Sequence, residues 1–132
     1  MDGFELNHAV SLFTEQTTTI TNLWTVYAVA TFAAAGFTAS PLSRPIAAAV
    51  TIGFLAFAIG HWHLLKQGLQ INVQLASDIS KFIQSHPGNS FEPSINNLIS
   101  TANPPWISLA IHPLIDACVV VALWARVKRT AS

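Results

Sequence analysis

The sequence predicts an all-α membrane protein: three transmembrane helices, an N-terminal amphipathic helix, and an external amphipathic helix between spans two and three. Of its 132 residues, 52% are hydrophobic and only 9% are charged, whereas soluble domains carry about 25% charged residues. Three stretches close to 20 residues long hold at most one charged side chain each. A helix of that length crosses a bilayer core of ~30 Å. We therefore treat residues 1–132 as a single membrane domain.

The N-terminal third contains the first amphipathic helix and the first span. Residues 2–16 predict a short helix because apolar side chains recur there at helical spacing, at Leu6, Val10 and Phe13. The alternative is a frayed terminal arm. We place span one at residues 20–39. The three consecutive threonines at 17–19 are poor helix formers, so we expect a bend between the two elements.

Span two is predicted at residues 45–66, and its short connection to span one makes the two helices antiparallel neighbours. A stripe of small side chains runs along one face, and such stripes let membrane helices approach closely; its members are Ala49, Gly53, Ala56 and Gly60. His63 continues this stripe. Residues two apart on a helix point about 200° apart. We therefore expect His63 in the bundle interior and His61 at the headgroups or in a subunit interface.

The segment of residues 67–104 is too polar to cross a membrane, and its first half is amphipathic. It is predicted to lie outside the bilayer, either in the membrane interface or as a cap on the bundle. Span three is predicted at residues 105–125.

The distribution of basic residues predicts the orientation. The connection between spans one and two and the C-terminal tail hold four Lys and Arg residues, against two on the other side, Lys66 at the end of span two and Lys81 in the external segment. The positive-inside rule then places the C-terminus in the cytoplasm and the N-terminus outside. We expect an integral protein of a bacterial inner membrane, with three tryptophans at the outer interface and one at the inner: Trp24, Trp62, Trp106 and Trp124.

Span three carries the most informative side chains. Ser108, His112 and Asp116 follow one another at intervals of four residues and form one polar stripe. A carboxylate in the middle of a transmembrane helix costs roughly 2.5–3.5 kcal/mol, so Asp116 should face protein or water. Pro113 also removes the usual N–H donor to the Leu109 carbonyl. The stripe therefore predicts a path or site for an ion, a proton or a polar ligand, and the alternative is a purely structural role in helix register.

The histidines suggest a second kind of site. If spans two and three are antiparallel, His63 and His112 both lie in the outer leaflet and can approach each other, with Asn22 or Thr25 of span one nearby. Imidazole is a ligand for metal ions and for haem iron. His61, His63 and His112 are thus the candidate ligands of a metal ion or a b-type haem, and two interfacial histidines without a specific role are the alternative.

These features favour an oligomeric channel or pore-type subunit, with Ser108, His112 and Asp116 along the path. The alternatives are a membrane anchor that binds a metal or haem, or a structural accessory subunit of a larger complex. A nucleic-acid partner is not expected because six basic and six acidic residues leave no net charge. No catalytic motif is present. We expect the partners to be the lipid bilayer and either further copies of the chain or other membrane subunits.

Overall fold

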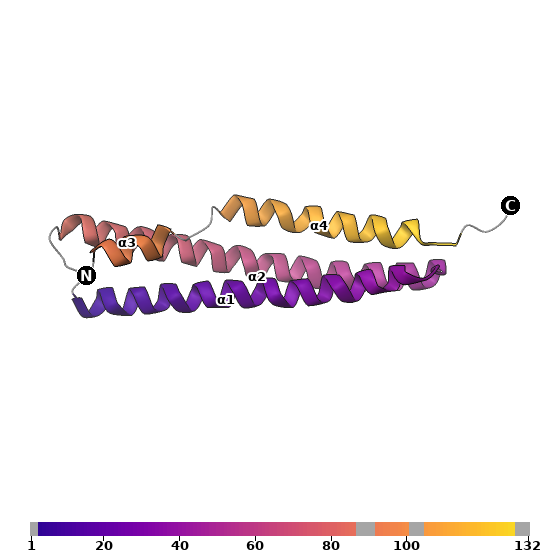
Figure 1. The fold of residues 1–132 in the computed structure, drawn as a ribbon, viewed down its shortest axis with the longest axis horizontal. Coiled ribbons are helices and arrows are strands. Elements are labelled where there is room, and N and C mark those ends of the chain that lie inside the picture. The colour runs from indigo at the N-terminus through magenta and orange to yellow at the C-terminus, as the bar shows by residue number, and fades with distance from the viewer. Residues whose placement is uncertain (1–2, 87–91, 101–104, 129–132) are drawn as a thin grey trace.

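The computed structural model describes residues 3–86, 92–100 and 105–128. They form four α-helices and one short 3₁₀ helix: α1 (Gly3–Gly36), η1 (Phe37–Ala39), α2 (Arg44–Ser85), α3 (Glu92–Ser100) and α4 (Pro105–Ala125). Within these ranges there is no strand, only an isolated bridge between Leu42 and Val127. Figure 1 shows α1 and α2 as a long antiparallel pair, with α4 lying along one half of it and α3 beside the other half.

Helix α1 is continuous, so the predicted division into a short helix at residues 2–16 and a span at 20–39, with a bend between them, is wrong. The three threonines lie within the helix, and their hydroxyls donate hydrogen bonds to carbonyls one turn back. Thr17 Oγ1 donates to the Phe13 carbonyl at 2.9 Å, and Thr18 and Thr19 bond likewise to the carbonyls of Thr14 and Glu15. Intrahelical bonding of this kind satisfies polar side chains on the helix surface.

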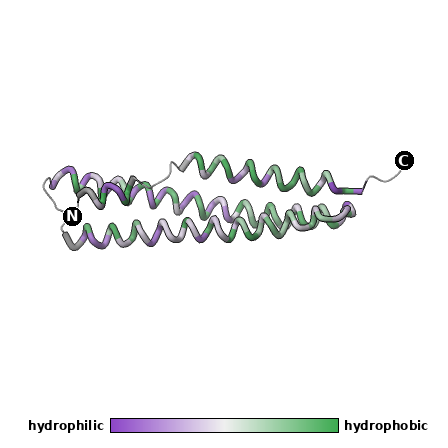
Figure 2. The backbone as a smooth tube through the Cα atoms, viewed as in Figure 1, coloured by the Kyte–Doolittle hydropathy of each residue, from purple (hydrophilic) through white to green (hydrophobic). Residues whose placement is uncertain are grey.

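Helix α2 continues without interruption for 42 residues, well beyond the end predicted for span two. At 1.5 Å per residue, α1 is about 51 Å long, α2 about 63 Å and α4 about 32 Å. Only α4 matches the thickness of a bilayer core. The predicted external helix is therefore the second half of α2, running straight on from the first. Figure 2 shows the hydrophilic residues concentrated at this far end of the pair.

Two apolar cores follow this division. One lies where α4 packs on α1 and α2, and its buried residues are Tyr27, Ala34, Leu42, Ala47, Phe54, Val119 and Leu123. The other joins the start of α1, the end of α2 and α3, and its buried residues are Leu6, Ala9, Phe13, Ile79, Phe82 and Ile83. The end of the bundle that extends past α4 thus consists of the start of α1, the end of α2 and α3. We call this part the three-helix cap. Residues 87–91 and 101–104 of the predicted external segment lie outside the described part of the chain.

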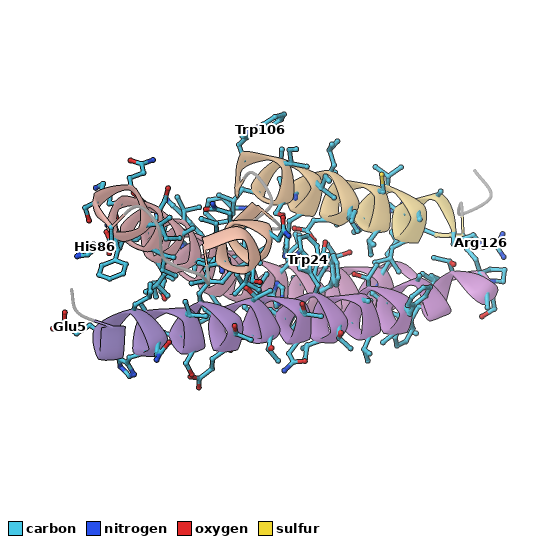
Figure 3. All side chains as sticks on the ribbon, turned by 60° about the vertical axis from the view of Figure 1, so that its left-hand side comes forward. Glu5, Trp24, His86, Trp106 and Arg126 are labelled. Atoms are coloured by element: carbon cyan, nitrogen blue, oxygen red, sulfur yellow. The ribbon has the colours of Figure 1, made fainter. Side chains whose placement is uncertain are left out.

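The α1–α2 connection and the end of α4 are joined by backbone hydrogen bonds. The Leu42 N–H donates to the Arg126 carbonyl at 2.8 Å, and the Lys128 N–H donates to the Leu42 carbonyl at 2.9 Å. Arg44 begins α2 at the same end, so these basic residues gather there, opposite the end that holds Glu5 and His86 (Figure 3).

The predicted packing face of α2 is wrong for contacts within this chain. Ala49, Gly53, Ala56 and Gly60 are exposed, and a Cβ atom added at Gly53 or Gly60 would meet nothing within 4 Å. The opposite face is buried instead, through Ala47, Phe54, Ala58, His61 and Leu65. Both faces of this helix are apolar, so hydrophobicity alone does not choose between them. The bulkier face fills the space that α1 and α4 leave.

Within the described ranges, three helices are long and apolar enough to cross a membrane: Glu5–Ala39, Arg44–Ser85 and Trp106–Ala125. This composition is compatible with an integral membrane location. Two of the four tryptophans lie on the bundle surface, Trp106 and Trp124. Figure 3 shows Trp106 pointing away from the bundle, while Trp24 lies between α1 and α4.

Candidate functional site

A chain of hydrogen bonds connects the three long helices where α4 packs on the pair. His61 Nδ1 of α2 lies 3.0 Å from His112 Nε2 of α4. His112 Nδ1 lies 2.9 Å from Asp116 Oδ2, one turn along the same helix. The Tyr27 hydroxyl of α1 is 2.5 Å from Asp116 Oδ1 and 3.1 Å from the His112 carbonyl. At the other end, His61 Nε2 lies 2.6 Å from the Leu23 carbonyl of α1. We call Tyr27, His61, His112 and Asp116 the polar network.

The network is enclosed by protein. The exposed fractions are 2% for Tyr27, 4% for His61 and 0% for His112, and 16% for the Asp116 side chain. The rings are stacked: the Tyr27 ring centroid lies 4.0 Å from that of His112 and 5.1 Å from that of His61. Buried polar groups are costly unless they are hydrogen-bonded, and here the partners come from all three helices. The network therefore fixes how α1, α2 and α4 are placed against one another.

If every contact of the network is a hydrogen bond, the number of protons that the network holds can be counted. A carbonyl oxygen only accepts, so the proton on His61 Nε2 must point to Leu23. One further proton must lie between His61 Nδ1 and His112 Nε2, and another between His112 Nδ1 and Asp116 Oδ2. Two neutral imidazoles beside an ionised carboxylate would supply one proton fewer and leave two lone pairs facing each other.

The network is complete only with that additional proton, which makes its net charge zero. The proton has three positions: on Asp116, on His112, or on His61 once the proton between the two rings has shifted. Each move is a transfer along one hydrogen bond and leaves the number of bonds unchanged. A cluster without net charge is also the form that a medium of low dielectric constant favours. The arrangement can therefore store a proton and move it between α4 and α2.

The Leu109 carbonyl is partnered, although Pro113 cannot bond to it. The indole Nε1 of Trp62 donates to this oxygen at 3.1 Å. The expectation that Pro113 frees this carbonyl for an ion is therefore wrong for this structure, because a side chain of α2 takes the place of the missing backbone N–H. The contact also fastens α2 to α4 one turn from His112.

The predicted site residues are only partly brought together. His112 and Asp116 lie in the network, and Ser108 is half-buried one turn before them. His63 is exposed, so the expectation that it faces the interior and His61 does not is reversed: the bulkier face of α2, which carries His61, is the buried one. Asn22 and Thr25 are exposed as well. Their expected place beside the histidines is taken by Tyr27 and the Leu23 carbonyl.

The geometry does not favour the metal or haem alternative. Among the described residues, no group of three or more His, Cys, Asp or Glu side chains is placed to hold a metal ion. A haem iron between two imidazoles needs their nitrogens about 4 Å apart, twice a metal–nitrogen bond of ~2 Å. The facing nitrogens of His61 and His112 are 3.0 Å apart instead, within hydrogen-bond distance.

Tyr27 is the network residue that the sequence-based analysis missed. Its signal was a stripe on α1 with alternating intervals of three and four residues, which runs through Thr17, Ile20, Trp24, Tyr27, Thr31 and Ala34. Such spacing marks the side of a helix that faces a partner. A tyrosine within it carries a hydroxyl that needs a buried acceptor, and Asp116 supplies one.

No protein-family model, curated protein or solved structure matches this chain. The part of the chain that the structure describes is almost entirely helical, with three helices of membrane-spanning length and a buried polar network among them. Its function has to be argued from that network.

Proposed function

We propose that this chain is a small integral membrane protein that conducts protons as a homo-oligomer, with the polar network as the relay within each copy. The observation that carries the proposal is the unbroken series of hydrogen bonds from the Leu23 carbonyl through His61 and His112 to Asp116 and Tyr27. A series of this kind passes a proton by short transfers and holds no space for a hydrated ion. The proposal thus specifies the channel-type function predicted from the sequence as a proton path.

The relay covers part of the bilayer thickness. Beyond Asp116 and Tyr27, toward the basic end of the bundle, the core consists of apolar side chains such as Ala34, Phe54 and Leu123. Asp116, however, also lines a groove of about 260 Å³ between α2 and α4, together with Ala58, Ile59, Trp62 and Pro113. We propose that a neighbouring copy seated at this groove continues the path. For that reason a single copy does not conduct.

The orientation belongs to the same proposal. Arg44, Arg126 and Lys128 gather at one end of the bundle, and the positive-inside rule assigns that end to the cytoplasm. The N-terminus and the three-helix cap are then outside, and the relay opens toward the outer face. Labelling of a Gln74→Cys variant from one side, in a Cys118→Ser background, tests this. Reaction of this exposed position only from the cytoplasm would invert the topology.

Proton flux into liposomes tests the function directly. The purified chain is reconstituted into phospholipid vesicles that contain a pH-sensitive dye, and a potassium gradient with valinomycin sets the membrane potential. We expect acidification with the wild type, background rates with Asp116→Asn and His112→Gln, and wild-type rates with the matched control His63→Ala. Background flux from the wild type would refute the proposal, as would full flux from Asp116→Asn.

The same variants separate the proposal from the structural alternative. If the network only holds the helices together, wild-type vesicles do not acidify, and His112→Gln is distinguished from the wild type only by its stability.

A further inference from the structure

A second polar feature lies one helical turn from the network. A small, partly open cavity of about 130 Å³ lies between α1, α2 and α4, and its lining residues are Thr17, Ile20, Thr21, Trp24, Leu69, Asn72 and Ser108. Four of these seven side chains are polar. They lie on the side of the network that faces the three-helix cap, because Ser108 precedes His112 by one turn of α4.

We propose that this cavity is a water-filled port through which the polar network exchanges protons with the outer face. This inference rests on the proposed proton relay and adds the route by which protons reach it. Liquid water occupies about 30 Å³ per molecule, so the cavity has room for about four molecules. Water stays in a buried cavity only where polar groups bind it, and this lining provides them.

Asn72 is the strongest of those groups. It is buried, and one of its amide N–H groups donates to Thr17 Oγ1 at 3.1 Å. A primary amide carries two N–H groups and an oxygen with two lone pairs. This single bond therefore leaves capacity that water in the cavity can fill. A buried amide is costly unless it is hydrogen-bonded, and water in the cavity can supply the remaining hydrogen bonds.

The cavity and the network share a wall. Trp24 lines the cavity, and its ring centroid lies 6.1 Å from that of His112 and 5.7 Å from that of Tyr27. The preceding residue, Leu23, provides the carbonyl that accepts the hydrogen bond from His61. Trp24 therefore lies between the cavity and the polar network, and a movement of its ring would bring water to the imidazoles.

Water in the cavity can be detected without any measurement of proton transport. A cysteine reacts as its thiolate, which forms readily in water and not in an apolar surrounding. We expect Ser108→Cys, in a Cys118→Ser background, to react with 2-aminoethyl methanethiosulfonate at least about tenfold faster than Ala110→Cys. Ala110 is the matched control because it lies two residues further on α4 and is exposed on the surface of the bundle. In the proposed membrane location this surface faces lipid, where a thiolate does not form readily. Intact mass spectrometry of the protein in liposomes gives the rates, and equal or reversed rates would overturn the proposal.

The route itself is tested by flux in the same vesicles. Asn72→Leu keeps the approximate volume of the side chain and removes its polarity, and we expect proton flux to fall at least about tenfold. Gln70→Leu makes the same kind of change at an exposed position of the same helix and should leave the flux unchanged. An unreactive Ser108→Cys with normal flux from Asn72→Leu refutes the port and leaves the relay standing. If Ser108→Cys is reactive but the wild-type protein shows no proton flux, the cavity holds water and the proposed function is refuted.

Discussion

Replacing Asp116 with asparagine separates proton transfer from structure more cleanly than any other substitution in this chain. The new amide oxygen can accept the hydrogen bond from Tyr27, and the amide N–H can donate to His112 Nδ1. His112 Nε2–H then donates to His61 Nδ1, and His61 Nε2–H donates to the Leu23 carbonyl. Every bond of the network is thereby kept with all groups neutral. The proton that occupied the His112–Asp116 bond has no site left, because an amide does not accept it.

The expected stability follows from these bonds. Each hydrogen bond contributes about 0.5–1.5 kcal/mol net, and Asp116→Asn loses none of them, so the free energy of unfolding should change by no more than about 1 kcal/mol. His112→Ala is the contrasting variant. It deletes a fully buried ring and strands His61 Nδ1 and Asp116 Oδ2, at about 1–3 kcal/mol for each unpaired group. With the cavity added, we expect a loss of at least about 3 kcal/mol.

Two assays on the same preparations decide the question. Unfolding in mixed micelles by titration with sodium dodecyl sulfate gives the stabilities, and flux into dye-loaded liposomes gives the activity. We expect Asp116→Asn to be as stable as the wild type and inactive. If it is destabilised as much as His112→Ala, the bonding pattern derived for the network is wrong. If it is stable and fully active, the network is not a relay.

Three further predictions concern the packing of α2. His61→Ala should lower the free energy of unfolding by about 2–4 kcal/mol because it removes two buried hydrogen bonds, whereas His63→Ala at the exposed position should change it by less than about 0.5 kcal/mol; similar losses in SDS titrations would contradict the assignment of the buried face. Trp62→Phe should lower the free energy of unfolding by about 1–3 kcal/mol because the Leu109 carbonyl loses its donor. About 1 kcal/mol or more of this loss should disappear in a Pro113→Ala background, where residue 113 again has a backbone N–H. If the effects of the two substitutions are additive, the Trp62 side chain does not replace the missing backbone donor. Gly53→Leu and Gly60→Leu should leave the stability of one copy unchanged because a Cβ atom added at either site meets nothing within 4 Å, and a smaller assembly by native mass spectrometry would show that this face binds another copy.

The sequence predicted the features that depend on local composition. The helix predicted at residues 105–125 has those bounds in the structure, as Pro105–Ala125. His112 and Asp116 lie among protein side chains, as expected for polar groups that lipid would not accommodate. These predictions follow from length, hydropathy and the helical period alone.

The buried face of α2 and the end of that helix could not be predicted from the sequence because both depend on the neighbouring helices. The small-residue stripe through Gly53 and Gly60 favoured one face of α2, yet both faces are apolar, and the positions of α1 and α4 decided for the face with His61. Because the wrong face of α2 was predicted to be buried, His63 was expected inside the bundle and His61 outside it, the reverse of their positions in the structure. The polar sequence after residue 66 predicted the end of span two, but α2 continues to Ser85 and packs there against α1 and α3.

The way in which the three helices share the network has a consequence for biogenesis. If the chain is inserted into a membrane in the order of its synthesis, the α1–α2 hairpin precedes α4, and at that stage Tyr27 lacks its carboxylate acceptor and His61 lacks its imidazole partner. These groups are completed only when α4 docks and the Leu42–Arg126 backbone contact closes the other end. Until then these polar groups lack their partners, which is costly in an apolar surrounding. A chain that stops before α4 should therefore be less stable than one that includes it.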